Sequence, residues 1–350
     1  MLLDPTRRWS PAQRIDDVLE MLPVALAGSV SAETHQAAIE LRTDPHESVG
    51  GAVAQLRRQR GELADALGRM GLAAAGAGMH PLALWSETEV TSASRYRLIR
   101  RTMRDLTTRE PTFALHVHVG VPHPERAIDL YNRLRVHLPL LLALSGNSPF
   151  WRGRDAGFAS TRTILFQAFP RTGMPRRYVS YAEWVETVDL QLRVGALPEP
   201  TFLWWDVRPQ PRFGTVEVRI MDAQSCVAET ATLVALVQSI ARLELEEGYA
   251  SERASSLEEM LAENRFLAAR DGVDARLIDP TTESLRPIPE ILDELLDAAQ
   301  PHASALGCLD EFEQAATLVA TPGATRQRGY SPSEDGLVHL LARLGDLFTA

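Results

Sequence analysis

The stretch LHVHVGV, residues 115–121, places two histidines two positions apart within a run of apolar residues. Successive side chains of a β-strand point to opposite faces of a sheet. A strand at this position therefore puts His116 and His118 on one face and Val117 and Val119 on the other. The imidazole rings either contact a metal or a substrate on that face, or they are ordinary packed histidines.

Three further short segments show the same alternation of apolar and polar residues. They are AIELRT (residues 38–43), LWWDVRP (residues 203–209) and TVEVRIMD (residues 215–222). Their polar faces carry Glu40 and Arg42, then Asp206 and Arg208, then Thr215, Glu217 and Arg219. An antiparallel sheet with one face on the core and one in water gives this alternation without any function. Charged and imidazole groups on four strands instead favour a polar sheet face that binds ions as an enzyme site.

These residue types suit a divalent cation and an anion held side by side. Mg²⁺ takes carboxylate oxygens and usually keeps water and substrate phosphate, so Glu40, Glu217 and one of the histidines are candidate ligands. Glu33, seven residues before Glu40, brings a second carboxylate to the rim. Arg208 and Arg219 could hold a carboxylate or a phosphate. From the residues alone, metal-assisted phosphoryl transfer and metal-assisted hydrolysis are close rivals, and simple pairing of Glu217 and Arg219 with neighbouring strands stays open.

The elements that position these residues are those of one α+β domain spanning residues 1–350. Apolar residues three and four apart predict long helices over residues 46–71 and 123–146. Residues 226–350 are predicted to be mainly helical. Residues 146–178 show no sustained period and several Gly and Pro residues, and a loop of that length in a compact domain is usually functional.

Composition narrows the classes of protein. The chain has 350 residues, of which 45% are hydrophobic, and a net charge of −10, which argues against binding to nucleic acid or to anionic membranes. Two cysteines, Cys226 and Cys308, are too few for a disulfide scaffold or a thiolate metal site. The sequence shows no signal-peptide pattern and no bilayer-length apolar run, so a cytoplasmic protein with small-molecule partners is expected. Loop arginines, among them Arg154 and Arg162, could hold a small anion.

Seven segments, taken in order, resemble the carboxylate–amine ligase family known as glutamate–cysteine ligase type 2. They are ETHQAAIELRTDP, GAGMHPLALW, SRYRLI, HVHVGV, ALSGNSPFWRGRDAGFASTR, WWDVRPQPRFGTVEVRIMD and ENRFLAARDG. The resemblance runs from the first residues to about residue 275 and is weaker beyond. It implies a fold shared with glutamine synthetase and the guanidino kinases, in which an antiparallel sheet forms a concave polar active-site face with helices on its other side.

The resemblance also implies an ATP-dependent reaction that joins a carboxylate to an amine. ATP would phosphorylate the side-chain carboxylate of glutamate, and the amino group of cysteine would attack the acyl phosphate to form γ-glutamylcysteine. Polyanionic ATP can approach a carboxylate only with the help of cations. The implied Mg²⁺ ligands are Glu33, Glu40, His116 and Glu217. The implied catalytic residues are Arg208 and Arg219, and the implied substrate- or ATP-binding residues are Arg154, Arg162, His118, Asn264 and Arg265.

The sequence departs from this family at its start. Members normally begin with a strand of closely spaced glutamates just before a segment like LLDP, and here Met1 directly precedes that segment. We therefore expect either a start further upstream or a metal site that lacks some carboxylates. Two alternatives follow: a catalytically silent ligand-binding homologue, and a kinase acting on a guanidino or carboxylate group, which needs no amine. The identity of the amine is left open, and a homo-oligomer is compatible with the superfold.

Overall fold

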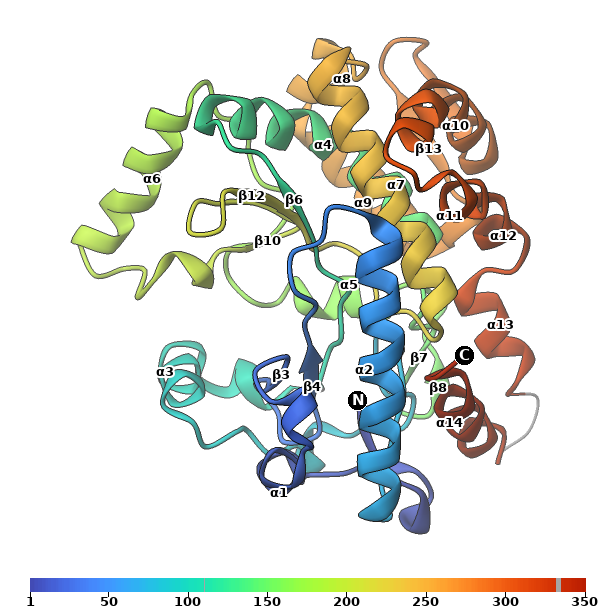
Figure 1. Ribbon diagram of the computed structural model, residues 1–350. Coiled ribbons are helices and arrows are strands. Elements are labelled where there is room, and N and C mark those ends of the chain that lie inside the picture. Colours follow the sequence, from blue (N-terminus) through green and yellow to red (C-terminus); the bar gives the residue numbers. More distant parts are fainter. Residues whose placement is uncertain (110, 332–334) are drawn as a thin grey trace.

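The computed structural model of this protein describes residues 1–109, 111–331 and 335–350. Helices and several small sheets make up the structure (Figure 1). The strands are β1 (Leu2–Asp4), β2 (Ser10–Pro11), β3 (Val30–Ala32), β4 (Ile39–Leu41), β5 (Ala73–Ala74), β6 (Val117–Gly120), β7 (Phe150–Trp151), β8 (Arg154–Asp155), β9 (Thr172–Gly173), β10 (Trp204–Trp205), β11 (Val207–Gln210), β12 (Thr215–Val218), β13 (Arg276–Asp279) and β14 (Ser284–Pro287). The α-helices are α1 (Ile15–Met21), α2 (Val49–Arg69), α3 (Ser94–Met103), α4 (Pro124–Ser145), α5 (Thr161–Phe166), α6 (Tyr181–Arg193), α7 (Val227–Glu246), α8 (Glu252–Ser256), α9 (Glu258–Asp271), α10 (Ile288–Ala305), α11 (Leu309–Glu313), α12 (Ala315–Ala320), α13 (Gly323–Gly329) and α14 (Gly336–Leu347).

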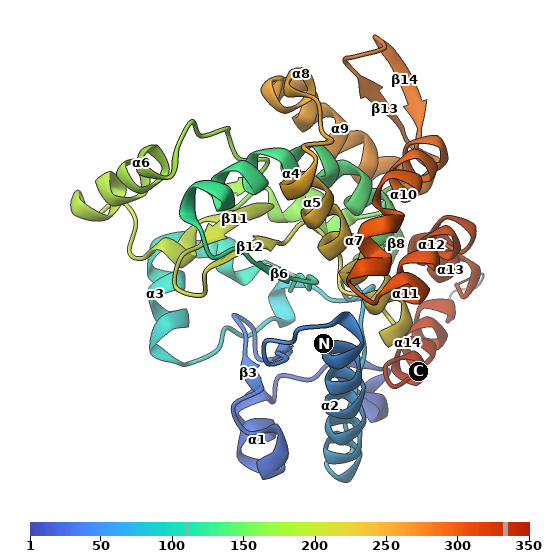
Figure 2. The ribbon, with the colours of Figure 1, turned by 45° about the horizontal axis from the view of Figure 1, so that its top comes forward.

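The largest hydrophobic core lies where α4, α7, α9 and α10 pack together (Figure 2). Helix α4 has Pro124 at its first position, where a missing amide hydrogen costs little. Its second half is the apolar run seen in the sequence, and Leu138, Leu141 and Leu142 are completely buried there. Each buried leucine contributes on the order of 2 kcal/mol, so this packing fixes the helical layer behind the sheet.

The candidate polar face belongs to a three-stranded antiparallel sheet in the order β11–β12–β6. On the central strand β12, Glu217 is paired in register with Arg208 on one side and His118 on the other. The next residue, Val218, is paired with Val207 on β11, and both valines are completely buried. This pairing places Glu217, Arg208 and His118 on one face as predicted, whereas Asp206, predicted on the same face as Arg208, contacts the buried Arg265 of α9.

The structure corrects the prediction of one continuous sheet to a set of small sheets. Glu40 lies on β4, which pairs with β3 in a hairpin of its own. The backbone between these two strands bonds elsewhere: the Ala37 carbonyl accepts from the amide of Leu2 at 2.8 Å, and the amide of Gln36 donates to Glu89 at 2.9 Å. Because those groups are already used, the hairpin is tied to the N-terminal strand and to the segment before α3 rather than to the three-stranded sheet.

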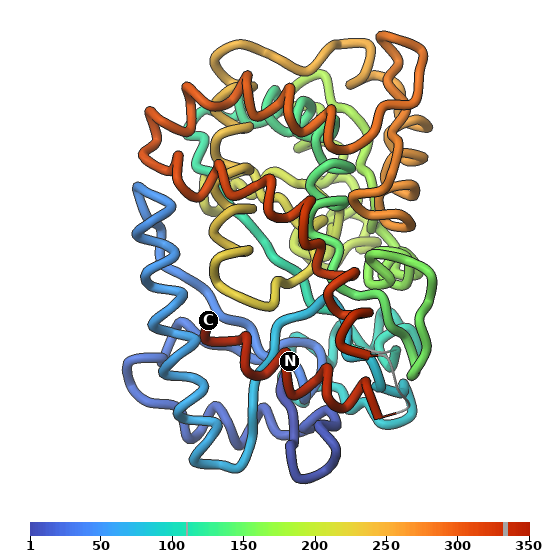
Figure 3. Tube along the Cα trace, turned by 90° about the vertical axis from the view of Figure 1, so that its right-hand side faces the viewer, coloured from blue at the N-terminus to red at the C-terminus, as the bar shows by residue number. Residues whose placement is uncertain are grey.

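The C-terminal part is largely helical, with β13 and β14 forming a hairpin between α9 and α10. The last helix, α14, returns to the N-terminal strands (Figure 3), where Leu340 and Leu344 pack in one cluster with Leu3. Within the described ranges, no helix is both long and apolar enough to cross a membrane.

Candidate active site

Glu217 is the centre of a buried ion-pair cluster on the polar face. Its side chain is 3% exposed, and each of its carboxylate oxygens contacts an arginine. Nε of Arg208 donates to Oε2 at 2.7 Å, and Nη1 of Arg219 donates to Oε1. Nη1 of Arg208 also donates to the carbonyl of Leu203 at 2.7 Å, which fixes the guanidinium group from its other side. The structure thus brings together three of the residues that the sequence singled out.

Both histidines of β6 face this carboxylate. Nδ1 of His116 lies 3.7 Å and Nε2 of His118 lies 3.6 Å from Oε1 of Glu217. Nη1 of Arg219 lies 3.3 Å from Nδ1 of His116, which makes that nitrogen the acceptor and assigns the ring proton to Nε2. Nδ1 of His118 bonds the hydroxyl of Thr215 at 2.9 Å. About a third of each imidazole is exposed, so a ligand can reach both rings.

The charges of the cluster are set by burial and by the two arginines. Burial alone would raise the pKa of Glu217, but Arg219 and Arg208 outweigh it and hold that pKa far below its ordinary value. Burial and the neighbouring Arg219 lower the pKa of Arg208 to about 10, against the opposing pull of Glu217. Burial, with Arg219 beside it, also holds the pKa of His116 well below its ordinary value, and burial lowers the pKa of His118. At neutral pH the cluster therefore contains one carboxylate, two cations and two neutral imidazoles.

Two more carboxylates lie near this cluster on the β3–β4 hairpin. Oε2 of Glu40 accepts from the hydroxyl of Ser31 at 3.0 Å, and Oε2 of Glu33 accepts from the amide of Thr34 at 2.9 Å. The surrounding protein and the charge of Glu40 raise the pKa of Glu33, while Arg219 lowers it. The side chain of Glu33 is nevertheless exposed to solvent. The two carboxylates repel each other, and a cation between them would relieve that repulsion.

The four implied metal ligands are not gathered into one coordination shell. No group of three or more His, Cys, Asp or Glu side chains within the described part of the chain is close enough to hold a metal ion. Glu217 is occupied by two arginines, whereas Glu33 and Glu40 make hydrogen bonds only to hydroxyl or amide groups among the described residues. Mg²⁺ bound with a nucleotide often takes only one or two protein carboxylates and completes its shell with water and phosphate. Glu33 and Glu40 fit that pattern better than Glu217 or His116.

The guanidinium group of Arg162 is buried and bonds to other groups of the protein. Its Nε donates to Oδ1 of the fully buried Asp222 at 2.7 Å, and its Nη2 donates to the carbonyl of Ile220. Asp222 also accepts from the hydroxyls of Ser148 at 2.7 Å and Ser160 at 2.8 Å. Residues 146–178, predicted as one loop, instead contain β7, β8, α5 and β9, and this region is anchored to the segment that follows β12. Arg162 supports the backbone next to Arg219.

The two predicted residues of α9 are also buried and partnered. The side-chain amide of Asn264 donates to the carbonyl of Ile278 at 2.9 Å and accepts from its amide at 2.7 Å, which pins β13 to α9. Arg265 contacts Asp206 and, at 3.1 Å, the side-chain oxygen of Gln167. Arg154 lies exposed in the β7–β8 hairpin, and no hydrogen bond or ion pair among the described residues joins it to Glu217. The structure thus leaves these three residues outside the polar face.

Three residues around the site were missed from the sequence. Asp222 is the last residue of the predicted strand segment TVEVRIMD, and an acidic residue at that place could have drawn attention as an anchor. Tyr96 donates its hydroxyl to the carbonyl of Ala32 on β3 at 2.5 Å, and Arg95 pairs with Glu199. Both belong to the segment SRYRLI, which was noted for its resemblance alone and not for any role of its side chains.

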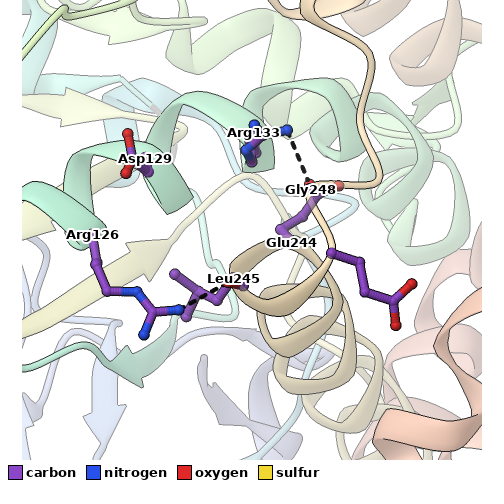
Figure 4. Close-up of a pocket in the computed structure, with 7 residues that line it drawn as sticks. Arg126, Asp129, Arg133, Glu244, Leu245 and Gly248 are labelled. Carbon is purple, nitrogen blue, oxygen red and sulfur yellow. Dashed lines mark hydrogen bonds and ion pairs between the residues drawn. The ribbon is translucent and has the colours of Figure 1, made fainter.

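A separate surface hollow of about 340 Å³ lies between α4 and the end of α7 (Figure 4). Its charged groups largely satisfy one another: Nη1 of Arg133 lies 3.8 Å from Glu244, and Arg126 donates to the carbonyl of Leu245 at 2.8 Å. Glu244 also contacts His137 at 2.5 Å. These pairs anchor the turn after α7, and we assign no ligand to the hollow.

Two solved structures share the fold of this chain. The glutamate–cysteine ligase of Francisella tularensis, solved in complex with AMP, matches with a TM-score of 0.69 and 13% sequence identity, over 100% of this chain and 87% of that one. A bifunctional glutathione synthetase from Pasteurella multocida matches with a TM-score of 0.69 and 11% identity, over 97% of this chain and 50% of that one. At these identities the likeness establishes the fold.

Comparison of sequences gives the family. Residues 1–334 match glutamate–cysteine ligase family 2, and the chain belongs to that family. A protein of Rubrobacter xylanophilus named "Putative glutamate--cysteine ligase 2-1" is 39% identical over 326 residues, which cover 93% of this chain and 86% of that protein. A relative from Jannaschia sp., named "Putative glutamate--cysteine ligase 2", is 35% identical over 328 residues, covering 93% and 87% of the two chains. The resemblance seen in the sequence motifs is confirmed.

Proposed function

We propose that this protein is an ATP-dependent ligase that joins a carboxylate to an amine, with glutamate and cysteine as the first substrates to examine. The observation that carries the proposal is the pairing of Glu217 with Arg208 and Arg219 on the polar sheet face, in a chain of glutamate–cysteine ligase family 2. The family implies small-molecule substrates, and a protein of the same fold was solved with AMP bound. A nucleotide is therefore the expected co-substrate.

In the first proposed step, the terminal phosphoryl group of ATP moves to the side-chain carboxylate of glutamate, and ADP leaves. Negative charge spreads over the oxygens of the transferred group, so fixed cations beside it lower the barrier. Arg219 and Arg208 are such cations. Glu217 holds both guanidinium groups in place before substrate arrives, so that they need little reorganisation during the transfer.

In the second proposed step, the amine nitrogen attacks the acyl-phosphate carbon. A C–N bond forms, the bond between that carbon and the phosphate oxygen breaks, inorganic phosphate leaves, and the nitrogen gives up a proton. A neutral imidazole can accept that proton, and His116 and His118 are neutral and partly exposed on the same face. Their lowered pKa values make them weak bases until an anionic substrate approaches and raises those values.

The proposed reaction also needs a metal ion, and Glu33 and Glu40 are the residues that would hold it. Bound Mg²⁺ would neutralise phosphate charge during the transfer. Desolvation and the nearby charge of Glu40 both raise the pKa of Glu33, and a bound cation would offset both effects. Arg219 lies close enough to influence Glu33, so phosphate held by the arginine would also approach these carboxylates.

The decisive experiment is ADP release by the purified protein with Mg·ATP and glutamate, measured with and without cysteine and then with a panel of other amines. Amine-dependent release that is lost in Glu217→Gln would support the ligase. Release that needs no amine would favour a kinase acting on a carboxylate or guanidino group. The control is Glu62→Gln at an exposed position on α2, which removes a carboxylate outside the site and should leave ADP release unchanged.

A second candidate is a ligand-binding homologue without turnover. One observation favours it: the implied metal ligands do not form a single coordination shell within the described residues. This candidate predicts that Mg·ATP raises the melting temperature although no ADP appears with any amine, because a ligand that binds only the folded protein stabilises it. Thermal unfolding beside the ADP assay separates the two functions.

A further inference from the structure

Helix α3 carries an exposed row of arginines in an acidic protein. The segment from residue 95 to residue 109 contains six of the 36 basic residues of the chain, and all 36 are arginine. Arg97 lies three and four residues before Arg100 and Arg101, so these three share one side of α3, and Arg104 follows directly after the last helical residue, Met103; we call these four arginines the basic stripe. Ile99 and Met103 on another side are buried in the main core.

No carboxylate among the described residues neutralises the charges of the basic stripe. All four side chains are exposed, and no ion pair within the described ranges involves any of them. Arg97 bonds a backbone carbonyl, that of Ser92, which leaves its charge uncompensated. Many other arginines of the chain pair with carboxylates, as Arg253 does with Glu283 and Arg286 with Glu294. Four cations without an ion pair among the described residues, on and directly after one helix of a protein with net charge −10, create a local positive field that attracts an external anion.

Helix α3 lies beside the candidate active site. Tyr96 bonds Ala32 of the hairpin that carries Glu33 and Glu40, and it is close enough for those two carboxylates to raise its pKa. Arg95 pairs with Glu199 and also bonds the hydroxyl of Thr201, whose carbonyl accepts from Arg208. Figures 1 and 2 both show α3 next to the β3–β4 hairpin and below the strands of the polar face.

The stripe begins next to these contacts. Arg97 follows Tyr96 directly, and Arg100, four residues after Tyr96, lies about 6 Å from it along the helix axis. At an ionic strength near 0.1 M, charges act over about 10 Å, so the field of the stripe reaches the mouth of the site. The net negative charge of the protein would otherwise repel a polyphosphate.

We propose that the basic stripe of α3 captures the polyphosphate chain of the nucleotide and guides it to the polar sheet face. This inference rests on the proposed function, because it takes the anion to be Mg·ATP. Clusters of one charge beside a cleft raise the local concentration and the association rate of an oppositely charged ligand, and salt weakens the effect. The stripe would therefore act on binding of the nucleotide rather than on the chemical steps.

The test replaces Arg97, Arg100, Arg101 and Arg104 together by Gln and measures binding of Mg·ATP and of inorganic tripolyphosphate by titration calorimetry. At about 0.02 M salt we expect the Kd for both anions to rise about tenfold, and at about 0.5 M salt we expect the variant and the natural chain to converge. The matched control replaces four exposed arginines on other elements that form no ion pair among the described residues, namely Arg57, Arg58, Arg69 and Arg276, and removes the same charge. We expect the control to bind like the natural chain.

Unchanged affinity of the stripe variant at low salt would overturn the inference. An equal loss in the control would also overturn it, because the total charge and not the stripe would then set the affinity. The outcome is separable from that of the proposed function. If binding depends on the stripe but no amine-dependent ADP release occurs, the ligase proposal is rejected and the role of the stripe is supported. If ligase activity is normal but binding does not depend on the stripe, the role of the stripe is rejected and the ligase proposal is supported.

Discussion

Arg265 and Asp206, 59 residues apart in the sequence, form a buried pair in which Nε of the arginine lies 2.5 Å from Oδ2 and Nη2 lies 3.4 Å from Oδ1. The backbone carbonyl of Asp206 accepts from the amide of Arg219 at 2.7 Å. Helix α9 is therefore connected to the arginine beside Glu217 through one aspartate. We therefore infer that Arg265 positions Arg219, whereas the sequence suggested that Arg265 contacts substrate or ATP.

We expect Arg265→Met and Asp206→Asn to lower kcat about tenfold or more through displacement of Arg219 and to lower the free energy of unfolding by about 3–5 kcal/mol, because each leaves a buried charge unpaired. The double variant should lose no more activity than either single one, since both act through the same contact. Steady-state kinetics and urea unfolding of the three variants measure this. Effects on kcat that add up would mean that Arg265 acts separately, for instance by touching substrate.

Arg219→Lys should reduce kcat by about 10²–10³, the cost typical of removing one preorganised charge donor from a transition state. Lysine keeps the charge but not the planar fork, so it cannot contact Glu217, His116 and a phosphoryl oxygen at once. Arg212→Lys on the exposed turn between β11 and β12 is the matched control and should keep normal activity. An active Arg219→Lys variant would remove Arg219 from the proposed catalytic step.

Glu33→Gln should make the protein more stable at neutral pH and less responsive to Mg²⁺. The pKa of Glu33 is raised in the folded state, so the ionised carboxylate costs stability, and this cost appears as the pH rises from the ordinary glutamate range through the folded value. Replacing the charge removes the cost and one proposed metal ligand. Unfolding at pH 4 and pH 7, with and without Mg²⁺, measures both effects. Equal stabilisation by Mg²⁺ in the variant and the natural chain would contradict the assignment of Glu33.

His35 and His80 should make the protein sensitive to acid. Burial lowers the pKa of each to about 4, from an ordinary value near 6.5. The unfolded chain therefore takes up protons first as the pH falls below about 6.5, and each histidine removes about 3 kcal/mol of stability by pH 4. Unfolding free energies at pH 7, 5 and 4 should show this loss, and His80→Gln should flatten it while the exposed His123→Gln should not. A flat profile in the natural chain would mean that these rings are not buried as neutral groups.

The polar face could be predicted from the sequence because a strand has a strict period of two. That period puts His116 and His118 on one face of their strand and Glu217 on the face opposite its valine neighbours, and the structure adds the pairing of β6 with β12 that brings them together. Helix α4 could also be predicted from the sequence, because its apolar residues recur at helical spacing, and its leucines are buried.

The supporting partners could not be predicted, because alternation does not reveal which charge lies across a contact. Arg162 and Arg265 have the residue type of anion ligands, yet each is satisfied by a buried aspartate from a distant part of the chain. The division of the strands among small sheets was also hidden, since pairing of β4 depends on where the backbone of Gln36 and Ala37 finds partners. Such long-range choices leave no periodic trace in the sequence.

The separate β3–β4 hairpin has a mechanical consequence. Among the described residues no backbone hydrogen bond links it to the three-stranded sheet, so the main chain does not fix the clearance between Glu33 or Glu40 and Arg219. That clearance is set by side-chain contacts, such as the one from Tyr96 to Ala32. The width of the site thus depends on side-chain packing, so a substitution such as Tyr96→Phe would change it without breaking any strand pairing among the described residues.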